Sequence, residues 1–438
     1  MTHQGPTTGS GIVMAVARWF DRRVKTGDVF ILAALVALAP LFFTNNYLLA
    51  PRLLNQIFFP VAVLLWLSFH LDWRNWPMVQ FRASARIFFV FSIILTAAFV
   101  YLLAMNVSSW RQPGAIMREV DKQWAYAGYI LLFMICFAFA IRTWREFLPR
   151  FVTAFATMVA ASALYNMVIY LSGLNLSGGV AFASEGVRLV NSLGMPGYTN
   201  STNISVTYAV LFVASAAVVV DSRLPRLMRF WMIPVALILL CGVVLTQARS
   251  AYVSVIVGLM IVLWTAPHAF RRAALISFVA GLVLGGLMLA LLPYTRAVME
   301  TRGTSHRPEI WTTYAGNALQ KPLLGYGGLS NIDIKLKDGT IIDQPHNLIL
   351  SAQIRGGMFC TLAMIALLAG SLYWAARFLT LRGEVIPLAM IATVATAGMF
   401  DYNLLITAVT WPWVTFWLPF SICAGAELVV RQCSQPPA

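Results

Sequence analysis

Long apolar runs alternate with short polar segments along this chain, and the pattern predicts a series of membrane-spanning helices. A helix needs about 20 mostly apolar residues to cross the hydrocarbon core of a bilayer. Runs of this length recur throughout the 438 residues, so we expect an all-α polytopic membrane protein with about 12 transmembrane helices. The expected spans are residues 28–44, 53–71, 87–105, 124–141, 151–172, 202–220, 230–247, 250–266, 274–292, 347–376, 385–404 and 408–429.

The composition agrees with this pattern. Hydrophobic residues make up 60% of the chain, charged residues only 11%, and the mean hydropathy is +0.76. Soluble domains have about half apolar and about a quarter charged residues. The first ten residues are polar and the first apolar run is long, so we expect no cleavable signal peptide. The five cysteines lack CxxC and metal-ligand spacings, so neither a disulfide framework nor a metal site is expected.

The net charge of +15 is explained by membrane topology rather than by nucleic-acid binding. If both termini are cytoplasmic, the inner segments carry about 18 of the 31 Lys and Arg residues, as the positive-inside rule requires. We therefore expect five regions: a cytoplasmic N-terminal segment 1–27, transmembrane helices 1–9 in 28–292, an outer loop subdomain 293–346, helices 10–12 in 347–429 and a cytoplasmic tail 430–438.

The outer side carries the longer connections, at residues 106–123, 173–200 and 293–345. Loops of this length in a compact protein are usually functional or disordered, so we expect the functional site on this side. Within the last loop we predict a helix around 308–319, followed by the turn-rich "KPLLGYGGLS" and a polar "KLKDG" turn.

Two arginines on the outer side are candidates for binding an anion, because arginine is permanently charged and donates bidentate hydrogen bonds. Arg249 lies in "LTQARSAYV", in a short connection between two apolar spans. Its alternative role is snorkelling to the bilayer interface. Arg188 precedes a Gly- and Asn-rich stretch that leads into a helix, and a solvated loop arginine is the alternative there.

His346 stands in "DQPHNLILSAQIRGG", where the outer loop meets an apolar run. A neutral imidazole can accept a proton from a hydroxyl nucleophile, although a histidine at an interface can also be a simple polar tip. Asp343 or Asn347 could orient the ring. In the loop, His306 is the rival base, and Arg307 contacts either a substrate or the neighbouring Glu309.

Arg355 follows His346 by nine residues in the same apolar run. On a continuous helix it would lie about 13 Å deeper and on the opposite face. An arginine in a span is a candidate functional residue unless it pairs with a carboxylate such as Asp401 or with backbone carbonyls, so its role is left open.

Four segments occur in an order that resembles the O-antigen ligase and polymerase superfamily of bacterial inner membranes. They are "VRLVNSLGMPGYTNS", "LTQARSAYV", "HRPEIWTTYAGNALQKPLLGYG" and "QPHNLILSAQIRGG", and they cover residues from about 185 to 357. The shared features are an Arg followed by Trp, a Pro-Leu-Leu-Gly-x-Gly turn and a Pro-His-Asn that opens a helix. Arg355 departs from the pattern, since a neutral or acidic residue is expected there.

The resemblance implies a glycosyltransferase of the inner membrane with its active site facing the periplasm, working without metal or other cofactor. Its donor would be a glycan linked to undecaprenyl diphosphate, and its acceptor a sugar hydroxyl of lipid A core. Carried over to this chain, His346 would be the general base, and Arg188 and Arg249 would hold the diphosphate. Arg307 is a weaker candidate, and inversion at the anomeric carbon is expected.

Among the activities of this superfamily we favour ligation to lipid A core in lipopolysaccharide biosynthesis. The chain ends nine residues after its last predicted span, without the C-terminal extension typical of many protein O-oligosaccharyltransferases. A polymerase of lipid-linked repeats is the main alternative. A flippase or secondary transporter is disfavoured, because the chain shows no internal repeat and its motifs gather on one side.

Overall fold

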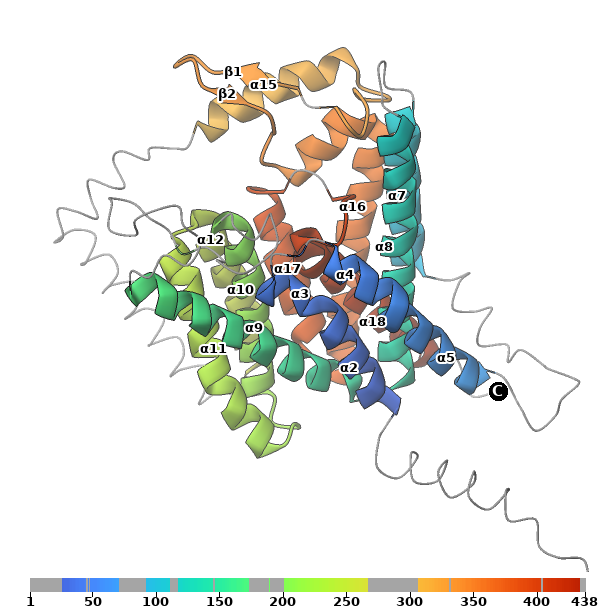
Figure 1. Ribbon diagram of the computed structural model, residues 1–438, viewed down its shortest axis with the longest axis vertical. Coiled ribbons are helices and arrows are strands. Elements are labelled where there is room, and N and C mark those ends of the chain that lie inside the picture. The colour runs from blue at the N-terminus through green and yellow to red at the C-terminus, as the bar shows by residue number, and fades with distance from the viewer. Residues whose placement is uncertain are drawn as a thin grey trace, which may run out of the picture.

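The computed structural model describes residues 26–44, 46, 48–70, 92–110, 117–144, 146–172, 189, 201–266, 306–330, 332–402 and 405–433. These residues form a helical bundle with a small subdomain beyond one end (Figure 1). The elements are α2 (Thr26–Leu38), α3 (Pro40–Phe43), α4 (Leu49–Leu53), the π-helix η1 (Leu54–Phe58), α5 (Phe59–His70), α7 (Ile93–Trp110), α8 (Met117–Thr143), α9 (Phe147–Ser172), α10 (Ser201–Val220), α11 (Arg226–Thr246), α12 (Arg249–Thr265), α15 (Arg307–Gln320), β1 (Ile334–Lys335), β2 (Ile341–Ile342), α16 (Leu348–Arg382), α17 (Ile386–Gly398), the π-helix η3 (Trp413–Trp417) and α18 (Leu418–Cys433).

The predicted polytopic, mostly helical architecture is confirmed. Within the described residues, nine helical segments are long and apolar enough to cross a membrane, and α12 and α17 are shorter apolar helices. Each predicted span coincides with an apolar helix except 274–292, which lies outside the described residues. The total of 12 spans and their orientation in the membrane stay predictions. The eleventh predicted span, 385–404, contains α17, which ends at Gly398.

Two elements occupy the centre of the bundle. In the most apolar stretch of α10, 83% of the residues are buried. In the corresponding stretch of η3 and α18, all of them are buried. A helix that is apolar on all sides is expected at such a position. Small residues let the neighbours approach: Gly425 of α18 lies against Ile141, and Gly258 of α12 lies against Val213 and Thr393.

A buried carboxylate joins α18 to the start of α7. Glu427 accepts hydrogen bonds from the backbone N–H groups of Ile93 at 2.8 Å and Ile94 at 3.1 Å, and from the Ser92 hydroxyl at 2.9 Å. Arg431 pairs with the same carboxylate at 2.7 Å. The first N–H groups of a helix have no partner within it and favour negative charge, so Glu427 caps α7 from a distant helix.

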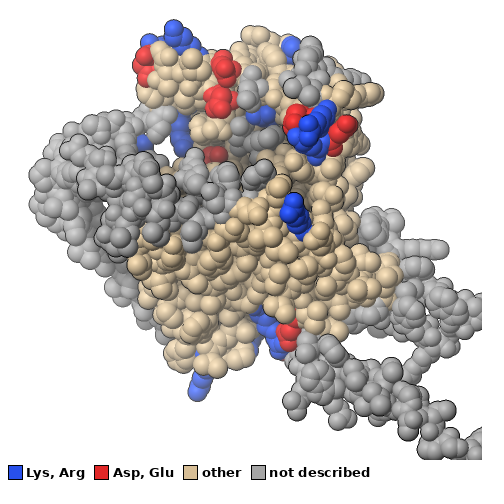
Figure 2. Space-filling model, viewed as in Figure 1, with Lys and Arg blue, Asp and Glu red and all other residues tan. Residues whose placement is uncertain are grey.

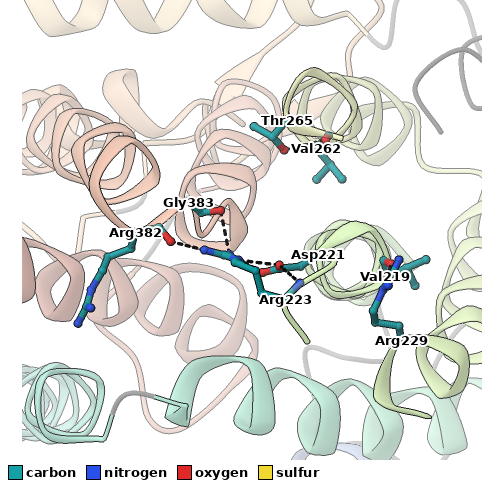
Figure 3. Close-up of polar contacts among 8 residues, drawn as sticks. All are labelled: Val219, Asp221, Arg223, Arg229, Val262, Thr265, Arg382 and Gly383. Atoms are coloured by element: carbon teal, nitrogen blue, oxygen red, sulfur yellow. Dashed lines mark hydrogen bonds and ion pairs between the residues drawn. The ribbon is translucent and has the colours of Figure 1, made fainter. Parts of the chain in front are cut away.

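Contacts at the end of the bundle away from the subdomain show which helix ends lie together (Figure 3). Arg223, in the connection between α10 and α11, pairs with Asp221 and donates to the carbonyls of Arg382 and Gly383 at the end of α16. The last turn of α12 lies in the same view. The starts of α11 and α17 are therefore at this end, and the start of α12 and the end of α17 are at the opposite end.

The subdomain consists of α15, the β1–β2 hairpin, the loop 321–330 and the first part of α16. Its core is separate from that of the bundle and comprises Ile310, Tyr314, Ala318, Ile334, Leu336 and Ile354. The "KLKDG" turn predicted from the sequence joins the two short antiparallel strands, which pair Ile334 with Ile342 and Lys335 with Ile341. Charged side chains gather on this subdomain and at the far end, with a broad, mostly uncharged surface between them (Figure 2).

The helix α16 is broken at Gly357, which divides it into residues 348–356 and 358–382. Gly357 has φ 66° and ψ −160°, a conformation outside the helical region that favours glycine. The carbonyls of Ile354 and Arg355, freed by the break, accept hydrogen bonds from Tyr326 N at 2.7 Å and Gly327 N at 2.9 Å. Because Leu350 and Ile354 pack in the subdomain core, the segment 348–356 belongs with the subdomain.

Candidate functional site

His346 lies between β2 and α16, where the subdomain joins the bundle. The residue is half-buried and has a left-handed backbone, with φ 48°. Burial lowers the pKa of the imidazole below its ordinary value; the charge of Asp401 opposes this shift, Arg307 adds to it and Asp343 opposes it. The ring is therefore held in the neutral form, which is the form that accepts a proton.

An ion pair stands beside His346 and connects α15 to the turn after α17. Arg307 Nη2 lies 3.0 Å from Asp401 Oδ1, and Nη1 donates to the carbonyl of Phe400. Only 6% of the Asp401 side chain is exposed. Its second oxygen, Oδ2, is buried and has no hydrogen-bond partner among the described residues. A buried carboxylate oxygen without a donor is costly, so this oxygen is a ready acceptor for a nearby proton.

Trp311 fixes the chain on the other side of the histidine. It is one helical turn after Arg307 and so lies on the same face of α15. Its indole Nε1 donates to the carbonyl of Pro345 at 3.1 Å, and its ring centre lies 6.2 Å from that of Phe400. The two residues of the "HRPEIW" motif thus hold both the residue before His346 and the turn that carries Asp401.

Asn347 uses both ends of its side-chain amide. Its Oδ1 accepts from Leu350 N at 3.0 Å and caps α16, and its Nδ2 donates to the carbonyl of Met399 at 3.1 Å. Of the two residues that could have oriented the histidine, Asn347 is therefore committed to the helix start and to the turn after α17. Asp343 acts on His346 through its charge.

Arg249 is the exposed first residue of α12, after a connection of two residues from the end of α11. Arg188 lies outside the described residues. Its neighbour Leu189 is described, and Leu189 N donates to the carbonyl of Leu245 in the last turn of α11 at 3.1 Å. Leu189 therefore lies beside the connection that leads to Arg249.

Arg249 and Asp401 stand at the same end of the bundle. The helices α12 and α17 meet where Gly258 faces Thr393, whose Oγ1 is 2.1 Å from the position that a Cβ at 258 would take. Counting outward from this contact, Arg249 is about 13 Å further along α12, and Asp401 follows the end of α17 by three residues. The cation of Arg249 and the Arg307–Asp401 pair thus lie at a similar depth.

His306 and Glu309 both bind the hairpin of the subdomain. His306 Nε2 lies 3.5 Å from Asp338 Oδ2, and both side chains are exposed. A hydrogen bond from Thr340 lowers the pKa of Asp338 below its ordinary value. Glu309 accepts from Lys337 N at 2.8 Å. Of the two contacts left open for Arg307, the pairing with Glu309 is not formed, because the Arg307 guanidinium points toward the turn after α17 and pairs with Asp401.

Three non-glycine residues of the described chain have positive φ, and each adjoins a candidate residue. They are Gln247 at 53°, two residues before Arg249; His306 at 54°, directly before Arg307; and His346 itself at 48°. A left-handed conformation costs a non-glycine residue about 1–2 kcal/mol. Such strain gathers at functional sites, where the surrounding structure holds the backbone in one geometry.

The expectation that His346 and Arg355 share one continuous helix is wrong. His346 precedes the helix, and α16 breaks at Gly357. Arg355 is buried against the subdomain, where Nη1 donates to the carbonyl of Gly328 at 2.8 Å. Its own carbonyl accepts from Ser108, in the last turn of α7, at 2.6 Å. The partner of Arg355 is thus a backbone carbonyl, and Asp401 pairs with Arg307 instead.

The sequence analysis names Asp401 only as a possible partner of Arg355, and its pairing with Arg307 beside His346 is the main feature that it missed. Asp401 lies 94 residues from Arg307 and stands in what looked like the end of an apolar span. The available signal was an acidic residue within that span, since carboxylates in membrane segments are rare and are usually paired.

These features define a polytopic membrane protein with a half-buried histidine and an Arg–Asp pair where a small subdomain joins the helical bundle. Residues 234–365 match the family model described as O-antigen ligase. The chain is also 28% identical over 193 residues to an O-antigen ligase of Pseudomonas aeruginosa. This aligned stretch covers 43% of this chain and 46% of that protein. The predicted resemblance to this family is confirmed for the matched segment, which contains Arg249, Arg307 and His346 but neither Arg188 nor Asp401. The match spans less than half of the relative's length.

Proposed function

We propose that this protein is an O-antigen ligase, which transfers a glycan from undecaprenyl diphosphate to a sugar hydroxyl of lipid A core. The reaction takes place at the periplasmic face of the inner membrane. The observation that carries the proposal is the placement of His346: its imidazole is half-buried, burial lowers its pKa, and it stands beside the paired Arg307 and Asp401. The matched family segment supports the class of reaction.

In the proposed reaction His346 accepts the proton of the acceptor hydroxyl. The hydroxyl oxygen attacks the anomeric carbon as the bond from that carbon to the diphosphate oxygen breaks, so the configuration is inverted. The products are the glycosylated acceptor and undecaprenyl diphosphate, and the imidazolium then returns its proton to water. Proton transfer of this kind accelerates a reaction by about 10²- to 10⁴-fold.

Asp401 assists this step by its charge. As His346 gains a proton it becomes a cation in a site of low polarity, and the buried Asp401 carboxylate lowers the free energy of that cation. The same attraction between the Asp401 charge and the imidazolium raises the pKa of His346. Arg307 holds the carboxylate in place, since its Nη2 lies only 3.0 Å from Asp401 Oδ1.

Negative charge develops on the leaving diphosphate, and we assign it to Arg249 and Arg188. Fixed guanidinium groups stabilise such charge without reorganisation. Two features support the assignment: Arg249 is exposed at the end of the bundle where Asp401 lies, and the segment after Arg188 is bonded to α11 just before Arg249. This leaves the α12 side of the site to the donor lipid.

The test compares two histidines that share a backbone conformation. Asparagine tolerates the left-handed region, so His346→Asn and His306→Asn leave the backbone unstrained. With purified lipid-linked glycan and lipid A core in detergent, we expect His346→Asn to lose about 10³-fold in transfer rate. The His306→Asn variant should transfer at nearly the wild-type rate. Equal activity of both variants would remove His346 as the base.

The donor requirement separates the alternatives within the superfamily. A ligase consumes donor only when lipid A core is present, whereas a polymerase lengthens the donor alone and a protein O-oligosaccharyltransferase needs a protein hydroxyl. A flippase would move the glycan across vesicles without a new covalent product. Full activity in excess chelator is expected for the arginine-based mechanism, and loss of activity that a divalent metal restores would contradict it.

A further inference from the structure

A groove opens on the side of the bundle opposite to α12, below the loop that carries the "PLLGYG" motif. It has a volume of about 510 Å³ and lies between α7, this loop and the break of α16. We call it the α7 groove; its lining includes Val100, Leu103, Val107, Leu324, Tyr326 and Phe359. A volume of this size is typical of sites that hold a small ligand.

The roof of the groove is rigid because backbone packs directly on backbone there. A Cβ at Gly325 would come within 2.6 Å of the Ile354 carbonyl oxygen, and one at Gly357 within 2.2 Å of the Leu323 carbonyl oxygen. Ser108 Oγ donates to the carbonyl of Leu324 at 3.0 Å and ties the loop to α7. The motif loop therefore keeps the groove open instead of collapsing into it.

The lining is apolar and continues into an exposed apolar rim. Leu323 is 56% exposed and Phe359 is 55% exposed, on a surface that faces the hydrocarbon when the bundle spans a bilayer. The charged residue in the lining of the groove is Lys321, whose Nζ lies 4.5 Å from the centre of the Tyr326 ring. An attraction of this type holds the ammonium beside the apolar space.

An apolar groove with a cation at its edge complements a lipid with an anionic head group. We propose that the α7 groove binds one acyl chain of the phosphorylated acceptor lipid, with a phosphate of its head group on Lys321. This inference rests on the proposed function. It assigns the lipid part of the acceptor to the α7 groove, whereas Arg249 and Arg188 bind the diphosphate of the donor. Two lipids then approach His346 from opposite sides of the subdomain.

The position of the groove explains why the acceptor rather than the donor fits. The groove ends at the break of α16, and the segment 348–356 between it and His346 is about 13 Å long. A donor reacts at the sugar attached directly to its diphosphate, so its phosphates must lie close to the general base, His346. An acceptor that carries several sugars can hold its lipid at the groove and reach His346 with a distant hydroxyl.

Kinetics with a matched pair of variants test the groove. Val100 in the α7 groove is 42% exposed, and Val63 in a separate apolar groove between α5 and α8 is 44% exposed. Tryptophan at Val100 fills the space, so we expect the KM for acceptor to rise about tenfold and the KM for donor to stay unchanged. Val63→Trp should change neither value. Wild-type kinetics in both variants would overturn the proposal.

The charge is tested by changing both partners. Lys321→Gln should reduce the preference for phosphorylated over dephosphorylated acceptor about fivefold. Lys337→Gln, in the hairpin turn, should leave the preference intact. An equal preference in Lys321→Gln and wild type would overturn the assignment of the phosphate.

Crosslinking separates this inference from the proposed function, because it needs no transfer. Lipid A with a photoactivatable acyl chain should label residues of the α7 groove in the full chain, and excess lipid A should block the labelling. Equal blocking by phosphatidylglycerol would show an ordinary bilayer lipid and overturn the proposal. Specific labelling without transfer in any assay would support the groove and refute the ligase function.

Discussion

Both ends of the bundle are fastened by an arginine that pairs with an aspartate and donates to carbonyls at the end of a helix. Arg223 joins Asp221 to the end of α16, and Arg307 joins Asp401 to the turn after α17. In the first pair the arginine is 44% exposed, against 25% for Arg307, and its aspartate is 13% exposed and only two residues away. In the second, Asp401 is nearly buried, comes from a segment 94 residues away, and keeps one oxygen without a donor beside a histidine. The same kind of Arg–Asp ion pair links helices at one end of the bundle and forms part of the candidate site at the other.

The largest difference is expected in the rate of transfer. Arg307→Ala frees the turn that carries Asp401 and shifts it relative to His346, and a misplacement of about 1 Å can lower a rate about 10²-fold. Arg223→Ala should change the rate less than about threefold, since nothing reactive adjoins it. Initial rates with saturating donor and acceptor measure both variants. Equal losses in the two would mean that the outer pair is only a fastening.

Stability should follow the same order with smaller effects. Removing Arg307 leaves the Asp401 carboxylate buried and unpaired, which costs about 3 kcal/mol of unfolding free energy. Removing the Arg223 side chain leaves Asp221, which is 13% exposed, with the hydrogen bond that it accepts from the backbone N–H of residue 223, so we expect about 1 kcal/mol or less. Thermal unfolding of the purified variants in detergent gives the comparison, with Asp401→Ala in the Arg307→Ala background as control. That second change should restore part of the loss, and an added loss would contradict the explanation.

The pH dependence should sharpen the role of Asp401. His346 must be neutral to act as base, and burial sets its pKa below the ordinary value, so transfer should fall only when the pH drops below that value. Asp401 raises this pKa, hence Asp401→Asn lowers it further and moves the acidic limb of kcat/KM to lower pH. Asp221→Asn at the other pair should leave the profile in place. A limb that moves to higher pH in Asp401→Asn would contradict the assignment.

The smallest expected effect concerns backbone strain. Gln247→Gly relieves the left-handed conformation before Arg249 but adds entropy to the unfolded chain, so a net gain of about 0.5–1 kcal/mol in stability is expected. Arg249 stays at the start of α12, and transfer should change little. The stability is measured by thermal unfolding, and a clear loss would show that the Gln247 side chain has a structural role of its own.

The hydropathy pattern predicted most of the bundle because a span depends on local composition. The runs that became α7, α8, α9, α10 and α11 needed only length and apolarity. The same criterion failed at α16: "IRGGMFC" continues an apolar run, yet Gly357 breaks the helix where the motif loop supplies hydrogen bonds to Ile354 and Arg355. A break stabilised by a segment thirty residues away leaves no local signal.

The candidate site was partly predictable for the same reason. His346 and Arg249 stand out as polar residues next to apolar runs, Arg307 stands in the outer loop, and their motifs point to one family. Which of these residues lie together cannot be read from the sequence, because Asp401 meets Arg307 only through the packing of α15 on the turn after α17. Which carboxylate neutralises which cation is a property of the fold, so Glu309, the nearest in sequence, was the wrong partner.

The cap on α7 bears on the order in which the chain can assemble. The N–H groups of Ile93 and Ile94 find their acceptor in Glu427, which follows them by more than 330 residues. During synthesis α7 enters the membrane long before Glu427 exists, and its first turn must meanwhile be satisfied by water or lipid head groups. The start of α7 therefore reaches its final position only after the last helix has inserted, and the α7 side of the bundle completes late.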